Sequence, residues 1–168
     1  MKVGLLFSKD EVDTLRRKVE SGLPRKMWEI VFEGAKGLLD SFTEEKAREE
    51  VKKDLMSQKG KAIQAAFAYI ITDDVRFADL AKRICSFLLS MPFLKAPGGP
   101  KPIDCGIGHA DYAREIAIVY DWIYDTLTDS EKEWLLDALI KKTVVNPSRD
   151  FEFSDQKGAR LLLRVVPT

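Results

Sequence analysis

Apolar residues recur at steps of three and four along most of the chain, which is the spacing of one face of a helix. The clearest case lies between residues 104 and 142, where a long periodic run is followed by Thr128 and Glu131. Thr-x-x-Glu is a capping box that starts a second helix, and the apolar stripe of that helix contains Trp134 and Leu135. Both tryptophans outside residues 120–124, Trp28 and Trp134, are expected in the core. The stretch therefore predicts an αα-hairpin, whose first helix carries Ile116, Val119, Tyr120, Ile123, Tyr124 and Leu127.

Three helices are predicted before residue 60. Ser8 precedes a charged run, which indicates a helix start, and Gly22 indicates the end of that helix. The next helix has a wide apolar face that includes Trp28, so we expect it to be well buried. The Ser-x-x-Glu motif at residues 41–44 matches a capping box, and it predicts a more solvated outer helix over 44–54.

Residues 62–71 are apolar on almost every side, which is typical of a helix surrounded by other helices. Turn residues at 72–74 follow, and then an amphipathic pattern from Phe77 to Met91. This part of the chain predicts a second αα-hairpin. A loop rich in proline and glycine over residues 92–103 separates the two hairpins.

The two hairpins form a weak repeat, each with a more buried inner helix and a more charged outer helix. We expect an all-α fold of about six helices in antiparallel αα-hairpins, forming an arc of an incomplete α/α toroid over residues 1–142. The tail over residues 143–168 fits a strand, a helical fragment or disorder equally well. An arc leaves apolar end faces, so self-association is expected.

Composition narrows the classes of function. The 168 residues include 27 basic and 27 acidic side chains, so the formal net charge is zero, while hydrophobic residues make up 45%. This balance gives no overall attraction for nucleic acid or an anionic membrane, and we expect neither as a partner. No segment matches a signal peptide or a membrane span, so the chain as written is expected in the cytoplasm. Cys85 and Cys105 lack the spaced partners of a metal site, and no metal or cofactor is expected.

A series of short motifs runs through residues 5–142. It comprises Leu6-Phe7-Ser8-Lys9-Asp10-Glu11, Ala68-Tyr69, Thr72-Asp73-Asp74, Phe77-Ala78-Asp79-Leu80-Ala81-Lys82, Ile118-Val119-Tyr120-Asp121-Trp122-Ile123-Tyr124, Leu127-Thr128 and Glu131. Their order and spacing resemble the N-terminal helical region of heparinase II/III-like and alginate lyases. The resemblance implies an incomplete α/α toroid that is followed, in the family, by a β-sandwich domain. It also implies cleavage of acidic polysaccharides by β-elimination, in proteins that are often exported.

The catalytic residues of that family have no counterpart in this chain. β-Elimination from a uronic acid needs a group that neutralises the carboxylate, a base and an acid. The family usually supplies an Asn-His pair and a Tyr from the toroid, and another His from the β-sandwich. Here Asn146 is the only asparagine and His109 the only histidine, and they are far apart in sequence. We therefore expect the chain alone to be inactive, and the residues after about 146 suggest a truncated or frameshifted product.

Six residues are candidates for binding a sugar, all in the helix predicted after residue 104. Tyr120 and Trp122 are able to form an aromatic wall for sugar rings, although such residues on inner helices more often pack against neighbours. Asp121 and Arg114 lie on nearby faces, so Asp121 either positions a hydroxyl or holds Arg114 or a helix end. His109 follows the loop with its lysines, where free backbone N–H groups are able to receive a carboxylate, unless Asp104 caps them. The full set is His109, Tyr112, Arg114, Tyr120, Asp121 and Trp122.

Two functions follow as hypotheses. The first is a partial, lyase-like toroid domain that binds acidic polysaccharide but lacks the residues for β-elimination. The second, from a different class, is a stand-alone helical module for protein interaction or structural support. Loss of glycan binding in His109→Ala or Tyr120→Ala would separate them.

Overall fold

The computed structural model describes residues 6–53, 55–58, 60–90 and 104–141, without the side chains of 9, 55–56 and 104–112. These residues form seven α-helices and two short 3-10 helices, and no strand occurs among them. The all-α prediction is confirmed, with one more α-helix than the six expected. The loop over 92–103 and the tail over 143–168 lie outside the described residues. The helices are α1 Lys9–Lys18, α2 Gly22–Ser41, α3 Glu44–Lys53, α4 Lys61–Thr72, α5 Val75–Ser90, α6 Asp104–Ile123 and α7 Asp129–Ile140, with η1 Leu55–Gln58 and η2 Tyr124–Thr126.

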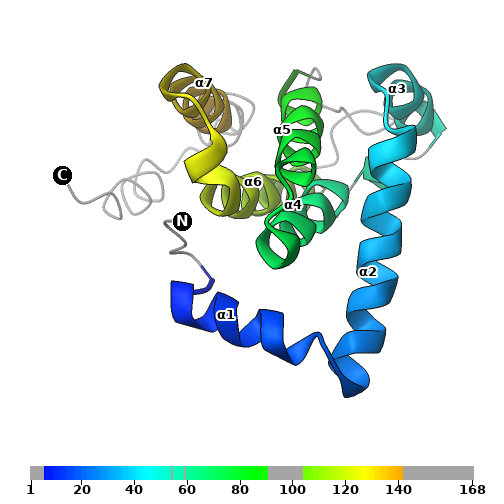
Figure 1. Cartoon of the computed structure of the whole chain (residues 1–168). Coiled ribbons are helices and arrows are strands. Elements are labelled where there is room, and N and C mark those ends of the chain that lie inside the picture. The colour runs from blue at the N-terminus through cyan, green and yellow to red at the C-terminus, as the bar shows by residue number, and fades with distance from the viewer. Residues whose placement is uncertain (1–5, 54, 59, 91–103, 142–168) are drawn as a thin grey trace.

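Helix α4 lies at the centre of the fold and packs against α1, α2, α5 and α6 (Figure 1). Several of its alanines are completely buried, because these small residues let neighbouring helices approach closely. Ile70 is also completely buried. The prediction of a helix surrounded by others is confirmed. The buried alanines are Ala62, Ala65, Ala66 and Ala68.

Helices α4 and α5 form the hairpin that was predicted from residues 62–91. Asp73 ends α4 in the left-handed region, with φ of 62°, and Arg76 N–H donates to Asp74 Oδ1 at 3.0 Å as α5 begins. A short polar residue tolerates this conformation better than a bulky one, which explains the tight turn. Phe77 and Phe87 on α5 are buried against the rest of the core.

Helices α6 and α7 form the hairpin that was predicted from residues 104–142. Helix α6 packs against α4 and α5, and α7 packs against α6 and α5. Between the two helices, η2 makes one 3-10 turn, and the capping box predicted at Thr128 and Glu131 is present. Thr128 N–H donates to Glu131 Oε2 at 2.8 Å, and Glu131 N–H donates to Thr128 Oγ1 at 3.3 Å.

Two helix boundaries near the N-terminus differ from the prediction. The first helix starts with a capping box formed by Ser8 and Glu11, as its charged run indicated, but it ends at Lys18 rather than at Gly22. Gly22, with φ of 65°, instead opens α2. Glycine reaches this left-handed conformation without strain. Gly22 was expected to end the first helix, but it forms the turn at which the second helix begins.

The capping box predicted at residues 41–44 is wrong. Ser41 is the last residue of α2, and its hydroxyl donates to Gly37 O at 2.6 Å. Thr43 caps α3 instead, because its Oγ1 accepts a hydrogen bond from Lys46 N–H at 3.2 Å. The intervening Phe42 is extended and buried, and its burial sets which of the two hydroxyl residues faces the new helix.

Candidate functional site

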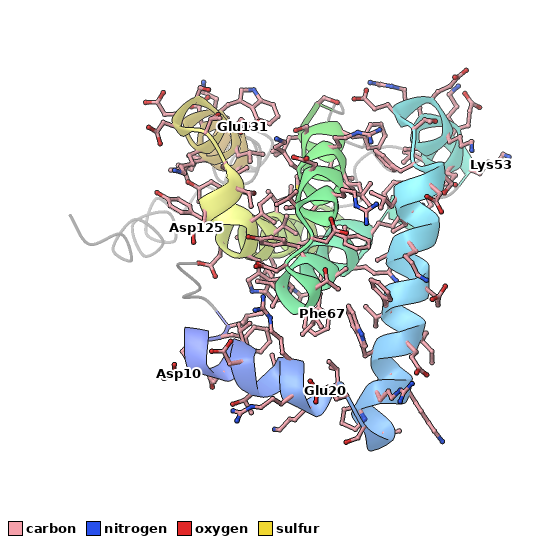
Figure 2. All side chains as sticks on the ribbon, in the orientation of Figure 1. Asp10, Glu20, Lys53, Phe67, Asp125 and Glu131 are labelled. Atoms are coloured by element: carbon pink, nitrogen blue, oxygen red, sulfur yellow. The ribbon has the colours of Figure 1, made fainter. Side chains whose placement is uncertain are left out.

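The two central aromatic residues of α6 point in different directions. Trp122 is 5% exposed and stacks on Phe7 at 5.7 Å between ring centroids, with Phe67 of α4 at 5.9 Å on another side. Residues two positions apart lie about 200° apart around a helix, so Tyr120 faces away from Trp122. Trp122 therefore belongs to the core, and the predicted aromatic wall does not include it. Figure 2 shows Phe67 on the side of α4 that faces α2, where its ring meets Trp28 edge-on at 6.0 Å between ring centroids.

The other candidates on α6 are dispersed. Arg114 is exposed and Asp121 is half-buried. His109 and Tyr112 fall in the part of α6 whose side chains lie outside the described residues, so their predicted role stays a prediction. Tyr120 lines a hollow of the described surface.

That hollow is broad and open, with a volume of about 430 Å³, and α7 forms most of its wall. Tyr120 packs edge-on against Tyr124 at 5.5 Å, and the Lys132 ammonium lies 4.6 Å from the centre of the Tyr124 ring. Partial burial, and then Tyr124, raise the pKa of the Tyr120 hydroxyl. A neutral phenol beside a lysine is suited to hydrogen bonding with a ligand rather than to proton transfer. The remaining lining residues are Asp129, Ser130, Glu133 and Leu136.

A second, more enclosed pocket lies where α3, α5 and α7 meet. Its volume is about 160 Å³, and it combines an aromatic side chain with four charged ones. Trp134 at this pocket is 46% exposed, so its predicted place in the core is wrong. Leu135, which is 2% exposed, occupies the inward position of α7 instead, because a helix packed on one side buries only one direction. The lining residues are Glu44, Lys82, Arg83, Ser86, Glu131, Trp134 and Leu135.

Lys82 and Glu131 form an ion pair that joins α5 to α7 across this pocket. The Lys82 ammonium lies 2.8 Å from Glu131 Oε1 and 3.3 Å from Asp79 Oδ1. The Lys82 ammonium, followed by the Thr128 donors, lowers the pKa of the Glu131 carboxyl to about 2. The same pairing raises the pKa of Lys82. Both groups are therefore fully charged at neutral pH, and neither is a good proton donor or acceptor.

Arg83 is the cation of the pocket that has no ion pair within the described part of the chain. Its Nη2 donates to Phe42 O at 3.3 Å, and its guanidinium lies 5.5 Å from the centre of the Phe42 ring. These contacts hold the planar head in place while leaving further N–H donors for a ligand. Lys82, by contrast, is already neutralised by Glu131.

Sequence reasoning missed Glu115, which is 2% exposed. Its Oε2 accepts a hydrogen bond from Gly60 N–H at 3.0 Å, and Gly60 caps the start of α4. A carboxylate at a helix N-terminus also interacts favourably with the helix dipole. Burial, together with Glu115, raises the pKa of the Cys85 thiol, which makes it a poor nucleophile. No local sequence signal marks Glu115, because its partner is 55 residues away.

Two further features concern only the described residues. No group of three or more His, Cys, Asp and Glu side chains in these ranges is arranged to hold a metal ion. None of the described helices combines the length and the apolar character that crossing a bilayer requires. Comparisons with protein-family models, with curated proteins and with solved structures found no match to this chain.

Proposed function

We propose that this chain is a partial polysaccharide lyase-like toroid domain that binds acidic polysaccharide without cleaving it. The observation that carries the proposal is the pocket between α3, α5 and α7, where the exposed Trp134 lies beside Arg83 and Lys82. An aromatic face packs against the apolar side of a sugar ring, and a guanidinium binds a carboxylate through two parallel hydrogen bonds. Glu44, Glu131 and Ser86 add acceptors and a hydroxyl for the hydroxyl groups of a sugar.

The arrangement of helices supports the toroid part of the proposal. In each of the two hairpins the first helix, α4 or α6, packs in the middle of the fold, and these two helices contact each other. The second helices, α5 and α7, also contact each other. Inner helices next to inner helices and outer helices next to outer helices form the repeat of an α/α arc.

The charge state of the pocket supports binding rather than turnover. β-Elimination needs a base that takes a proton near neutral pH. Glu131 is ionised, with a pKa of about 2, and is held by Lys82, so it is too weak a base for that step. Tyr120 in the other hollow has a raised pKa, which makes the phenolate base harder to form.

Titration of the protein with alginate and heparan-type oligosaccharides, followed by calorimetry, tests this function. Trp134→Ala and Arg83→Met are expected to weaken binding at least about tenfold each. Ile140→Ala and Arg25→Met are matched controls, because Ile140 is 45% exposed on the same helix and Arg25 is an exposed arginine on α2. These controls are expected to bind as the unchanged protein does.

The same titration separates this pocket from the hollow at Tyr120. If Tyr120→Ala abolishes binding while Trp134→Ala has no effect, the sugar site lies at α6 and α7, as the sequence motif suggested. Absence of binding to every acidic glycan would reject the function. The unsaturated product of β-elimination absorbs ultraviolet light, and no absorbance is expected on incubation with substrate.

A helical interaction module is the second candidate function, and one observation favours it. Leu23, Met27 and Ile30 on α2 are 68%, 61% and 75% exposed. Large apolar side chains gathered on one face of a helix are typical of a contact surface. This module would leave glycans unbound but would associate through α2.

A further inference from the structure

The outer face of α2 has a regular order of side-chain sizes. Leu23, Met27, Ile30, Gly34 and Gly37 follow one another at steps of three and four. With 3.6 residues per turn, all five lie within about 80° of each other around the helix axis. The half nearer the start of α2 carries three large side chains. The half nearer its end has two glycines, of which Gly34 is half-buried beside Gln64 of α4 and Gly37 is exposed. We call these five positions the α2 stripe.

The large side chains of the α2 stripe lack neighbours in the described chain. Ile30 is 75% exposed and Leu23 is 68% exposed, while Trp28 and Phe32 on the inner face stack on each other at 4.9 Å and contact the core. At Gly37, no atom lies within 4 Å of where a Cβ would be. Helix α2 forms one edge of the molecule, away from α6 and α7 (Figure 1). The stripe thus offers protruding side chains at Leu23, Met27 and Ile30 and an open flat surface at Gly37.

We propose that the α2 stripe binds the α2 stripe of a second copy of this chain, in antiparallel orientation about a two-fold axis near Ile30. This axis places Leu23 on the flat surface at the partner's Gly37, and Ile30 on the partner's Ile30. Large side chains then meet glycine at both ends of the contact, which lets the two helices approach closely. Parallel pairing would set Leu23 against Leu23 and leave an empty space at Gly37.

The charges beside the stripe favour the same orientation. Lys26 and Glu33 are both exposed and lie on the same flank of α2. A two-fold axis perpendicular to the helix places the flank of one copy next to the same flank of its partner. Lys26 of each copy therefore lies opposite the partner's Glu33, which gives two such ion pairs per dimer. Lys26 has no ion pair within the described chain, and Glu33 is paired only with Lys36 on the surface. Parallel pairing would place this flank and the partner's on opposite sides of the contact, so neither Lys26–Glu33 pair would form.

One helix face buries less area than the roughly 800 Å² per partner of a standard interface. The dimer is therefore expected to dissociate on dilution. Sedimentation velocity of the full chain from about 10 µM to about 1 mM is expected to show a monomer converting to a dimer. Ile30→Asp is expected to remove the dimer, since it would bury two carboxylates against each other. Ile140→Asp is the matched control, because Ile140 is 45% exposed on α7, and it is expected to leave dimerisation unchanged.

A charge exchange tests the antiparallel register. Lys26→Glu or Glu33→Lys alone places like charges opposite each other and is expected to weaken dimerisation about tenfold. The double variant Lys26→Glu/Glu33→Lys is expected to restore it. The two residues are seven positions apart, about 10 Å along the helix, so they do not contact within one chain, and rescue requires a partner. Circular dichroism checks that each variant keeps its helices.

Three results would overturn the proposal. The first is a monomer across the whole concentration range. The second is a dimer that Ile30→Asp leaves intact, which would place the contact elsewhere. The third is a dimer that Ile30→Asp disrupts but that the double charge exchange does not rescue, which would reject the antiparallel register. None of these results depends on glycan binding, so this inference and the proposed function stand or fall separately.

Discussion

Helices α4 and α2 are both rich in apolar residues, yet they meet opposite surroundings. Helix α4 carries four completely buried alanines and is covered on every side, whereas α2 carries larger side chains on two faces and buries only one of them. Small side chains let four helices approach α4, and the bulk of the core then comes from those neighbours, such as Phe77 and Phe87. The comparison shows that an apolar residue count does not set burial; side-chain size and position in the fold do.

The largest difference between the two helices is expected for the same substitution in each. Ile70→Ala in α4 removes a completely buried side chain and is expected to lower the free energy of unfolding by about 2–5 kcal/mol. Ile30→Ala in α2 removes a side chain that is 75% exposed and is expected to change it by less than about 0.5 kcal/mol. Urea denaturation at low protein concentration measures both. Equal losses would mean that the outer face of α2 is covered in solution.

The helix starts offer a second contrast. The N–H of Gly60 at the start of α4 is capped by the buried Glu115, while Ser21 before α2 makes no side-chain capping hydrogen bond. Glu115→Ala leaves Gly60 N–H without its acceptor and is expected to cost about 1–3 kcal/mol in urea denaturation. Glu115→Gln retains a carbonyl acceptor and is expected to cost less. A loss as small as that of the exposed Glu133→Ala would show that the cap contributes little.

Two glycines of α2 are expected to respond differently to one methyl group. At Gly37 nothing lies within 4 Å of an added Cβ, so Gly37→Ala is expected to stabilise the monomer by about 0.5–1 kcal/mol through higher helix propensity. At Gly34 the Cβ would lie 2.1 Å from Gln64 Nε2, which donates to Val31 O at 2.9 Å. Gly34→Ala displaces that donor, so its thermal stability is expected to be about 1 kcal/mol below that of Gly37→Ala. The opposite order would show that Gln64 rearranges at no cost.

The smallest effect is expected at the ion pair between α5 and α7. The pKa of Glu131 is lowered in the folded chain from 4.5 to about 2, so its contribution is present above pH 4.5 and is lost as the pH falls toward 2. Because the pair is partly exposed, the contribution is at most about 1 kcal/mol. Lys82→Met is expected to reduce the acid-induced fall in melting temperature over this range. Lys141→Met, an exposed lysine on α7, is the control, and an equal reduction there would contradict the assignment.

Local signals predicted the helices well. Ser8 with Glu11, and Thr128 with Glu131, form capping boxes within four residues, so the sequence alone contains the whole interaction. The apolar run over residues 62–71 likewise predicted the central position of α4, because no polar face remained for solvent. These predictions needed no knowledge of the neighbouring helices.

The wrong predictions concern positions where packing against another part of the chain determines which of two nearby residues caps a helix or is buried. Ser41 and Thr43 are both capping residues, and the burial of Phe42 determines which one caps α3. Trp134 and Leu135 are adjacent on α7, and the direction of α5 and α6 determines which of them is buried.

The candidate pocket between α3, α5 and α7 was not predictable from spacing for the same reason. Its residues come from three separated segments, and no local pattern links Glu44 with Arg83 or Trp134. On α6, the predicted apolar stripe included Tyr120 but not Trp122, and no local pattern indicated that Phe7 and Phe67 would enclose Trp122. Of the candidates whose side chains are described, Trp122 is buried, whereas Tyr120 lines a hollow and Arg114 is exposed.

The hydrogen bond from Gly60 to Glu115 has a consequence for the order of folding. The two residues are 55 positions apart, so the start of α4 remains uncapped until α6 has docked. The α4–α5 hairpin is able to form first from local contacts, but its first turn would stay frayed. The amide proton of Gly60 therefore reports on α6: its exchange with solvent slows only when the second hairpin is in place, and its protection measures how tightly the two hairpins are joined.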